Sequence, residues 1–217
     1  VLVKNDLDLV IAKATSIDRE AKTLHTTGGK IGYDRLILAT GSDPAMPPIP
    51  GFELEGVFAI SKDVEYLSKL QQWLDTARDV VVIGGGFIGI ELGDEMNKAG
   101  DKNVTIVELM PHCLALAYDV EFCIEMEKVL ESRGLELRTS VRVDQMVGNG
   151  RVEKVVLSDG TEVQADTVIV GVGAVANVDL ARKANLRVGL TGGIVVDRTM
   201  KTSDDSIFAC GDCAEKI

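Results

Sequence analysis

The chain has 217 residues, a formal net charge of −11 and 46% hydrophobic residues. This length allows one large domain or two smaller ones, and the acidic balance argues against a nucleic-acid partner or an anionic membrane. No apolar run reaches the length of a membrane span, and the four cysteines do not form the framework of a small secreted domain, so we expect a cytoplasmic protein without a membrane segment.

The first 51 residues predict strands followed by a linker. An antiparallel three-stranded meander with a turn at Gly28-Gly29 is predicted from Leu9 to Thr15, Lys22 to Thr26 and Lys30 to Tyr33. Asp34 to Gly41 then predicts a buried strand that ends in glycine. Four prolines between Ser42 and Gly51 exclude a helix or a central strand, so that stretch is a predicted linker.

The middle of the chain predicts helices alternating with buried strands. Asp63 to Leu74 predicts a helix whose apolar face carries Val64, Leu67 and Leu70. The β-branched run from Val80 to Ile83 predicts a strand buried on both faces. A helix ending at Gly100 should follow, since apolar residues recur at helical spacing at Ile88, Leu92 and Met96. Val104 to Val107 predicts a second buried strand.

A glycine pattern lies between those two strands, and an acid follows the second. Gly84, Gly86 and Gly89 fit G-x-G-x-x-G, and Glu108 stands 24 residues beyond Gly84. In a dinucleotide-binding fingerprint, the first glycine permits the tight turn, the second lets the backbone approach a pyrophosphate, and the third lets the helix pack on the strand. The acid accepts hydrogen bonds from the adenosine ribose. The alternative is a tight turn in an α/β core that binds no ligand.

The second half repeats the order of the first. Asp119 predicts the start of a helix that ends before Gly134, with an apolar face of Phe122, Met126, Val129 and Leu130. After a strand from Leu135 to Leu137, a second meander is predicted from Val141 to Val147, Arg151 to Leu157 and Glu162 to Ala165. Asp166 to Gly173 predicts another buried strand that ends in glycine and aligns without a gap with Asp34 to Gly41.

This repetition predicts a duplication at domain scale. The second copy has its fingerprint ahead of it, whereas the equivalent position for the first copy falls upstream of Val1. We therefore expect a chain that lacks the front of a first nucleotide domain. Ile194 to Val196 and Ile207 to Asp212 predict two further strands, and a helix should begin near the last residues, so we expect the chain to be cut there as well.

The chain resembles the two-dinucleotide flavoproteins, that is, the pyridine nucleotide–disulfide oxidoreductases with their ferredoxin reductase and NADH oxidase relatives. Three motifs carry the resemblance: Tyr33 to Ser42, Val82 to Glu91, and Ile207 to Asp212. The resemblance implies an α/β protein in which a Rossmann-like nicotinamide-dinucleotide domain with a three-stranded meander, residues 46–173, is inserted between pieces of an incomplete FAD-binding domain, residues 1–45 and 174–217.

The resemblance also implies the cofactor sites. NAD(H) would be bound by Gly84, Gly86, Phe87, Ile88, Gly89, Glu91, Glu108, Gly171, Val172 and Gly173, and FAD by Ala39, Thr40, Gly41, Gly211 and Asp212. It implies no catalytic residue and no metal ligand in this segment. The parent would be a homodimeric FAD-dependent NADH oxidoreductase, and we expect this segment alone to be inactive. Electrons would pass to oxygen, a disulfide or a redox carrier protein; the alternative is an NAD(H)-binding module without turnover, used as a sensor or subunit.

Two further features allow more than one interpretation. Cys210 and Cys213 have the C-x-x-C spacing of a redox pair or half a zinc site, but they fall on the turn of the flavin motif, which favours packing thiols. His112 follows Pro111 in the loop after Glu108. It either approaches the adenosine end of a bound dinucleotide or is exposed to solvent, and the loop position favours exposure.

Overall fold

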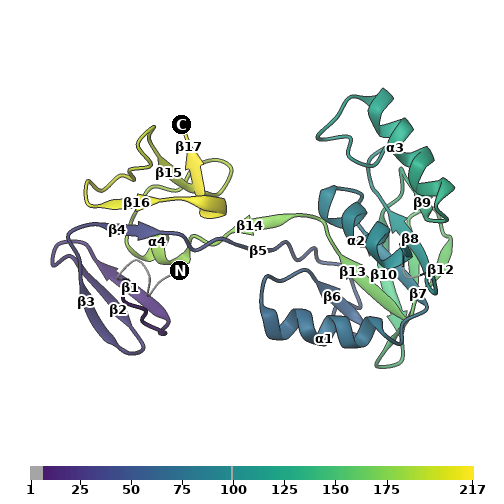
Figure 1. Ribbon diagram of the computed structural model, residues 1–217, viewed down its shortest axis with the longest axis horizontal. Helices are drawn as coiled ribbons and strands as arrows, with labels where there is room; N and C mark the ends of the chain where they lie inside the picture. Colours follow the sequence, from purple (N-terminus) through teal and green to yellow (C-terminus); the bar gives the residue numbers. More distant parts are fainter. Residues whose placement is uncertain (1–6, 99) are drawn as a thin grey trace. The chain divides into compact units, whose positions relative to one another are not determined.

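The computed structural model describes residues 7–98 and 100–217 (Figure 1). The chain forms two compact units, each with its own core. Unit 1 comprises residues 1–43 and 175–217, of which residues 1–6 lie outside the described part, and unit 2 comprises residues 44–174. The strands β5 (Ser42–Pro44) and β14 (Ala174–Ala176) pair as a two-stranded sheet where the chain passes from one unit to the other.

Unit 2 is built on a five-stranded sheet of order β6-β13-β7-β8-β9. Each neighbouring pair is parallel. Its strands are β6 (Val57–Ala59), β13 (Thr167–Val170), β7 (Asp79–Ile83), β8 (Asn103–Val107) and β9 (Glu136–Arg138). The residues of β13 are fully buried, as is typical of a parallel strand that is covered on both faces. The sheet therefore forms the middle layer of three.

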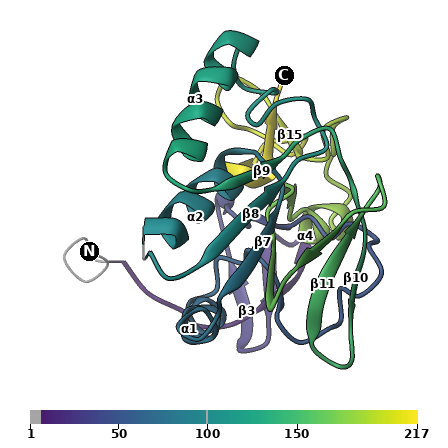
Figure 2. The same cartoon turned by 90° about the vertical axis from the view of Figure 1, so that its right-hand side faces the viewer.

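Alternate residues of β7 face the two outer layers. Val80 and Val82 pack with the helices α1 (Val64–Leu74), α2 (Phe87–Lys98) and α3 (Val120–Ser132). Val81 and Ile83 pack instead with the antiparallel meander β10 (Val143–Gly148), β11 (Val152–Leu157) and β12 (Glu162–Gln164). Figure 2 shows α2 and α3 on one side of β7 and β8 and the meander on the other. This arrangement follows from the period of two along a strand.

The helix faces agree only in part with those that periodicity predicts, since Leu130 of α3 and Met96 of α2 are buried as expected. Phe122 and Val129 of α3 are exposed, and the buried side chains of that helix are Cys123 and Leu130. On α2 the buried face is Gly89, Gly93 and Met96, whereas Ile88 is 42% exposed. An apolar repeat shows which residues share a face, but only the packing partner decides how much of that face is covered.

Unit 1 contains an antiparallel meander and two short parallel pairs. The meander is β1 (Ala14–Asp18), β2 (Thr23–Thr26) and β3 (Gly29–Gly32); the strand expected from Leu9 begins only at Ala14. The first pair is β4 (Leu36–Leu38) with β16 (Ile207–Ala209), and the second is β15 (Ile194–Val196) with β17 (Ala214–Lys216). The helix expected near the end is wrong, since a 3₁₀ turn at Gly211–Cys213 leads directly into β17. One short helix, α4 (Asp179–Lys183), has no counterpart among the predicted elements.

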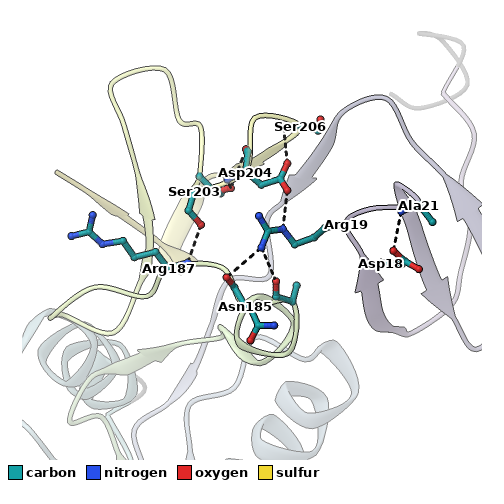
Figure 3. A network of polar contacts seen from close by, with 10 residues as sticks. Asp18, Arg19, Ala21, Asn185, Arg187, Ser203, Asp204 and Ser206 are labelled. Atoms are coloured by element: carbon teal, nitrogen blue, oxygen red, sulfur yellow. Dashed lines mark hydrogen bonds and ion pairs between the residues drawn. The ribbon is translucent and has the colours of Figure 1, made fainter.

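A polar network joins three segments of unit 1 (Figure 3). Arg19 Nε donates to Asp204 Oδ2 at 2.8 Å, and Arg19 Nη1 lies 3.4 Å from the carbonyl oxygen of Ala184. The Asp204 carboxylate also accepts from the backbone N–H of Ser206 at 2.9 Å. The Arg19 hydrogen bond is the main cause that holds the pKa of Asp204 below its ordinary value. The network ties the end of β1 to the residue after α4 and to the turn before β16.

Across residues 7–98 and 100–217, no helix is both long enough and apolar enough to cross a bilayer.

Candidate functional site

Unit 2 contains a cavity of about 920 Å³ at the carboxyl ends of its parallel strands. Four parts of the unit line it: the turn between β7 and α2, the loop after β8, the start of β10, and the loop after β13. Residues 47–49 close it on a further side. Ligands of open α/β sheets bind in the crevice outside the carboxyl ends of the strands, and this volume lies within the range of small-molecule sites.

Two glycines in and after the turn between β7 and α2 are required by backbone conformation or by close packing. Gly84 has φ of +107°, and a Cβ there would lie 2.7 Å from the carbonyl oxygen of Gly171. A Cβ on Gly89 would overlap the carbonyl oxygen of Gly84. Both positions therefore need glycine for the fold alone, whether or not a ligand binds.

Gly86 differs from these two glycines. It lines the cavity directly before α2, and its φ is outside the left-handed region. Among the described residues, a Cβ at this position would have no neighbour within 4 Å beyond the adjoining backbone. Neither backbone conformation nor packing inside the protein requires a glycine here. A group that approaches the backbone from the cavity does require one.

Glu108, at the end of β8, is held by two backbone N–H groups. Gly85 donates to its Oε2 and Met110 to its Oε1, each at 2.6 Å. A carboxylate has about four lone-pair positions, so two remain to accept hydroxyl groups from the cavity. The acid is thus held beside the glycine turn before any ligand arrives.

The loop after Glu108 crosses the glycine turn and is fastened to α3. Leu114 donates its N–H to the carbonyl oxygen of Gly85 at 2.8 Å. Glu127 of α3 accepts the N–H of Cys113 at 2.8 Å and lies 3.0 Å from His112 Nδ1. Because a carboxylate can only accept, we assign the proton to Nδ1 of His112. His112 lines the cavity with its side chain 28% exposed, so it is partly buried rather than the solvent-exposed loop histidine that the sequence favours.

The other predicted nicotinamide-site residues divide between the cavity and its support. Phe87, Ile88, Gly171, Val172 and Gly173 line the cavity. Gly89 lies buried beneath the turn, and Glu91 is exposed on α2; both lie outside the described lining. Glu91 lies about one turn after Phe87 and Ile88, the residues of α2 that line the cavity.

In unit 1 the predicted flavin-site residues lie at one edge. Ala39, Thr40 and Gly41 follow β4, and Gly211 and Asp212 follow β16, its parallel neighbour. Ser42 donates its hydroxyl to Asp212 Oδ2 at 2.9 Å, which joins the two segments directly. Gly41 and Gly211 both have positive φ, of +67° and +75°. The structure therefore brings the two motifs together at the carboxyl ends of paired strands.

The C-x-x-C pair lies within that same turn of unit 1. Cys213 is fully buried, and its Sγ lies 3.2 Å from the carbonyl oxygen of Cys210 and 3.5 Å from that of Leu38. All four cysteines of the chain are free thiols. The geometry is that of a buried thiol packed against the backbone.

Sequence reasoning missed Arg142 and Asp144 at the cavity. The residues directly after Glu108 include no lysine or arginine, yet Arg142 lines the same cavity and pairs with Asp144 at 2.8 Å. The segment before Arg142 runs beside the loop after β8, because Val141 donates its N–H to the carbonyl oxygen of Glu108 at 3.2 Å. The start of the second meander was the available signal, since it follows the strand next to β8.

Comparisons with known proteins agree with this architecture. The chain is 38% identical over 201 residues to a rubredoxin-NAD(+) reductase of Ectopseudomonas oleovorans, which covers 92% of this chain and 51% of the relative. It superposes with a TM-score of 0.93 on a ferredoxin reductase of Rhodopseudomonas palustris, at 34% identity over 99% of this chain and 53% of that one. A FAD-dependent pyridine nucleotide-disulphide oxidoreductase of Desulfovibrio vulgaris gives a TM-score of 0.84 at 32% identity, over 95% of this chain and 54% of that one.

The chain thus spans about half the length of these three relatives. The family described as pyridine nucleotide-disulphide oxidoreductase matches residues 3–217, which is almost the whole chain. That match covers both pieces of unit 1 as well as unit 2, in agreement with the three motifs in the sequence. This chain belongs to the pyridine nucleotide-disulphide oxidoreductase family.

Proposed function

We propose that the cavity of unit 2 binds NAD(H), and that the chain is part of an FAD-dependent NADH oxidoreductase. The observation that carries this proposal is Gly86, a glycine that lines the cavity although neither its φ nor its packing among the described residues requires one. The names of relatives support it, since they include NAD(+) and FAD.

The residues present fit a dinucleotide. The first residues of α2 line the cavity, and the dipole and unpaired N–H groups at the N-terminus of this 12-residue helix would favour an anion such as a pyrophosphate. Glu108 would accept the ribose hydroxyls with its two remaining lone-pair positions. Gly171 and Gly173, on either side of Val172, line the cavity without presenting side chains to it. These residues bind and orient the dinucleotide.

Unit 1 would contribute to the flavin site. Asp212 and Ala39 to Gly41 would contact the flavin cofactor where the motifs after β4 and β16 meet. When both cofactors are bound, the nicotinamide supplies a hydride and the flavin accepts it. The protein's share is positioning and electrostatics, and no proton-transfer residue is needed in this chain.

The electron acceptor would be oxygen, a disulfide or a carrier protein. Each class has support among the names of relatives, which include a rubredoxin-NAD(+) reductase, an NADH oxidase and a persulfide reductase. Where the parent works as a sensor or a subunit instead, NAD(H) would bind at the same cavity without flavin reduction.

Titration of NADH into the chain, followed by the backbone amide resonances, tests the binding site. The amides of Gly84, Gly85, Gly86 and Gly171 should shift together as NADH is added. Those of Gly150 and Gly160, in the turns of the second meander, serve as internal controls. Shifts confined to other parts of the chain, or no shift at millimolar NADH, would refute the assignment.

A further inference from the structure

We infer that Glu127, on the helix α3, is a positioning residue for the adenosine side of the dinucleotide. The inference rests on the proposed NAD(H) function of the cavity and goes beyond it. Glu127 lies on a helix that the glycine fingerprint does not include, and it acts through the loop after β8. It would not touch the cofactor itself.

The first step runs from α3 to the loop. The Glu127 side chain is 15% exposed and holds two consecutive residues, through the Cys113 N–H at 2.8 Å and His112 Nδ1 at 3.0 Å. Hydrogen bonds to a charged acceptor are stronger than neutral ones, and two on one carboxylate fix the direction of the loop as well as its distance. The loop is thus attached to α3 at one defined point.

The second step runs from the loop to the glycine turn. Cys113 is fully buried, and its Sγ would lie 2.6 Å from a Cβ placed on Gly85. The next residue, Leu114, donates its N–H to the carbonyl oxygen of Gly85 at 2.8 Å. The loop therefore holds Gly85 both by van der Waals contact and by a backbone hydrogen bond.

The third step runs from Gly85 to Glu108. The N–H of Gly85 donates to Glu108 Oε2 at 2.6 Å, and a Cβ placed on Gly85 would lie 3.1 Å from Glu108 Cβ. Gly85 is thus enclosed between Cys113 and Glu108. A shift of the loop on α3 moves Gly85, and with it the carboxylate that faces the ribose. A hydrogen bond of this length is lost when its donor and acceptor separate by about 1 Å more.

If Glu127 only stabilised the fold, its effect on NADH binding would not depend on Glu108. A double-mutant cycle of Glu127 and Glu108 therefore separates positioning from stability. We expect Glu127→Ala to weaken NADH binding roughly tenfold in the folded chain, as for the loss of a hydrogen-bonded charge. In a Glu108→Ala background the same change should weaken binding less than about twofold. NADH binding is measured by calorimetry, and folding by circular dichroism and thermal melting.

Two variants complete the design. Glu131→Ala is the matched control, because Glu131 is an exposed acid one turn further along α3 and its removal changes the net charge equally. Glu127→Gln keeps the side-chain volume and one acceptor, so it should retain most of the affinity, with a loss of about threefold. If Glu127→Ala does not fold, the cycle is measured with Glu127→Gln, and its threefold loss should vanish in the Glu108→Ala background.

The outcomes distinguish this inference from the proposed function. Wild-type binding of NADH together with unchanged affinity in the Glu127 variants would overturn the positioning role alone. Equal effects of Glu127→Ala with and without Glu108 would do the same, because the residue would then act independently of the carboxylate. No binding of NADH by the wild-type chain would overturn both the inference and the function on which it rests.

Discussion

The carboxylate of Glu108 lies 2.6 Å from the backbone nitrogen of Gly85, so the acid after β8 is joined directly to the glycine turn after β7. The two residues follow the neighbouring parallel strands β7 and β8, whose carboxyl ends lie at the cavity. This contact fixes where a negative charge stands in the site. We expect this charge to determine which nicotinamide dinucleotide the proposed site prefers.

We predict that the chain binds NADH at least tenfold more tightly than NADPH. A 2′-phosphate would bring nearly two negative charges beside Glu108, and at roughly 4 Å and an effective dielectric near 20 each pair costs on the order of 4 kcal/mol before screening. Even a third of that cost is about a tenfold change in affinity. Glu108→Ala should reduce the difference in affinity between NADH and NADPH. Calorimetry with both cofactors at one ionic strength measures this difference, and equal dissociation constants for the wild type would contradict the assignment of Glu108 to the ribose.

Asp144 should strengthen the preference for NADH over NADPH, because it holds Arg142 in an ion pair. Arg142 lines the cavity but is paired with Asp144 at 2.8 Å, and the pair is partly exposed. Asp144→Asn should free the guanidinium for a 2′-phosphate and improve NADPH binding about two- to fivefold, the range that an exposed ion pair allows. NADH affinity should stay nearly constant. Glu162→Gln breaks an exposed pair with Lys154 on the same meander and is the control. Equal improvement in both variants would show a general charge effect only.

The four thiols should differ in reactivity according to burial. Cys210 is partly exposed, whereas Cys113, Cys123 and Cys213 are buried. Burial, with the charge of Glu127 as the second cause, raises the pKa of Cys113 to about 12, so its thiolate is scarce near neutral pH. In the folded chain a maleimide should label Cys210 first and the other three only after denaturant is added. Mass spectrometry of tryptic peptides follows the order. Early labelling of Cys113 would contradict the packing of the loop against Gly85.

The Arg19–Asp204 pair should make unit 1 sensitive to acid. Arg19 holds the pKa of Asp204 below its ordinary value, so the stabilisation is present above the unfolded pKa of about 3.9 and is lost as the pH falls through the folded pKa. Arg19→Met should cost about 1 kcal/mol of unfolding free energy at pH 6 because the pair is partly exposed. That cost should shrink below pH 4 or so. The control is Arg35→Met, which removes an equal charge. Urea unfolding measures both, and a cost of Arg19→Met that is independent of pH would contradict the role of the ion pair.

Much of unit 2 could be predicted because its signals are local. The runs at Val80 and Val104 are apolar because both faces of the sheet are covered. Gly84 is required locally by its positive φ, and Gly89 by its contact with the Gly84 carbonyl oxygen. The parts that sequence reasoning missed depend on tertiary contacts. Glu127 meets Cys113 only because α3 packs against the loop after β8, and Arg142 reaches the cavity only because the segment before β10 runs beside that same loop. No spacing along the chain encodes either contact.

Unit 1 was harder to predict, and the reason is its short elements. Residues 214–216 form a three-residue strand beside β15, where the sequence predicts a helix. A strand of three residues is determined by its partner rather than by its own propensity. In unit 2, the exposed Phe122 and Val129 of α3 are a separate case, because their apolar character predicted burial that the fold does not provide.

The affinity of Gly86→Ala for NADH, measured by calorimetry beside Gly32→Ala, tests the central claim most directly. Both glycines lack a positive φ, and a Cβ placed on either would have no described neighbour within 4 Å, but only Gly86 lines the cavity. Both variants should melt within a few degrees of the wild type, since Gly→Ala changes of about 1 kcal/mol or less are expected where the backbone tolerates a side chain. Gly86→Ala should weaken NADH binding at least tenfold, while Gly32→Ala should bind it as the wild type does. Undiminished NADH binding by folded Gly86→Ala would show that the dinucleotide does not approach this turn, and would contradict the account.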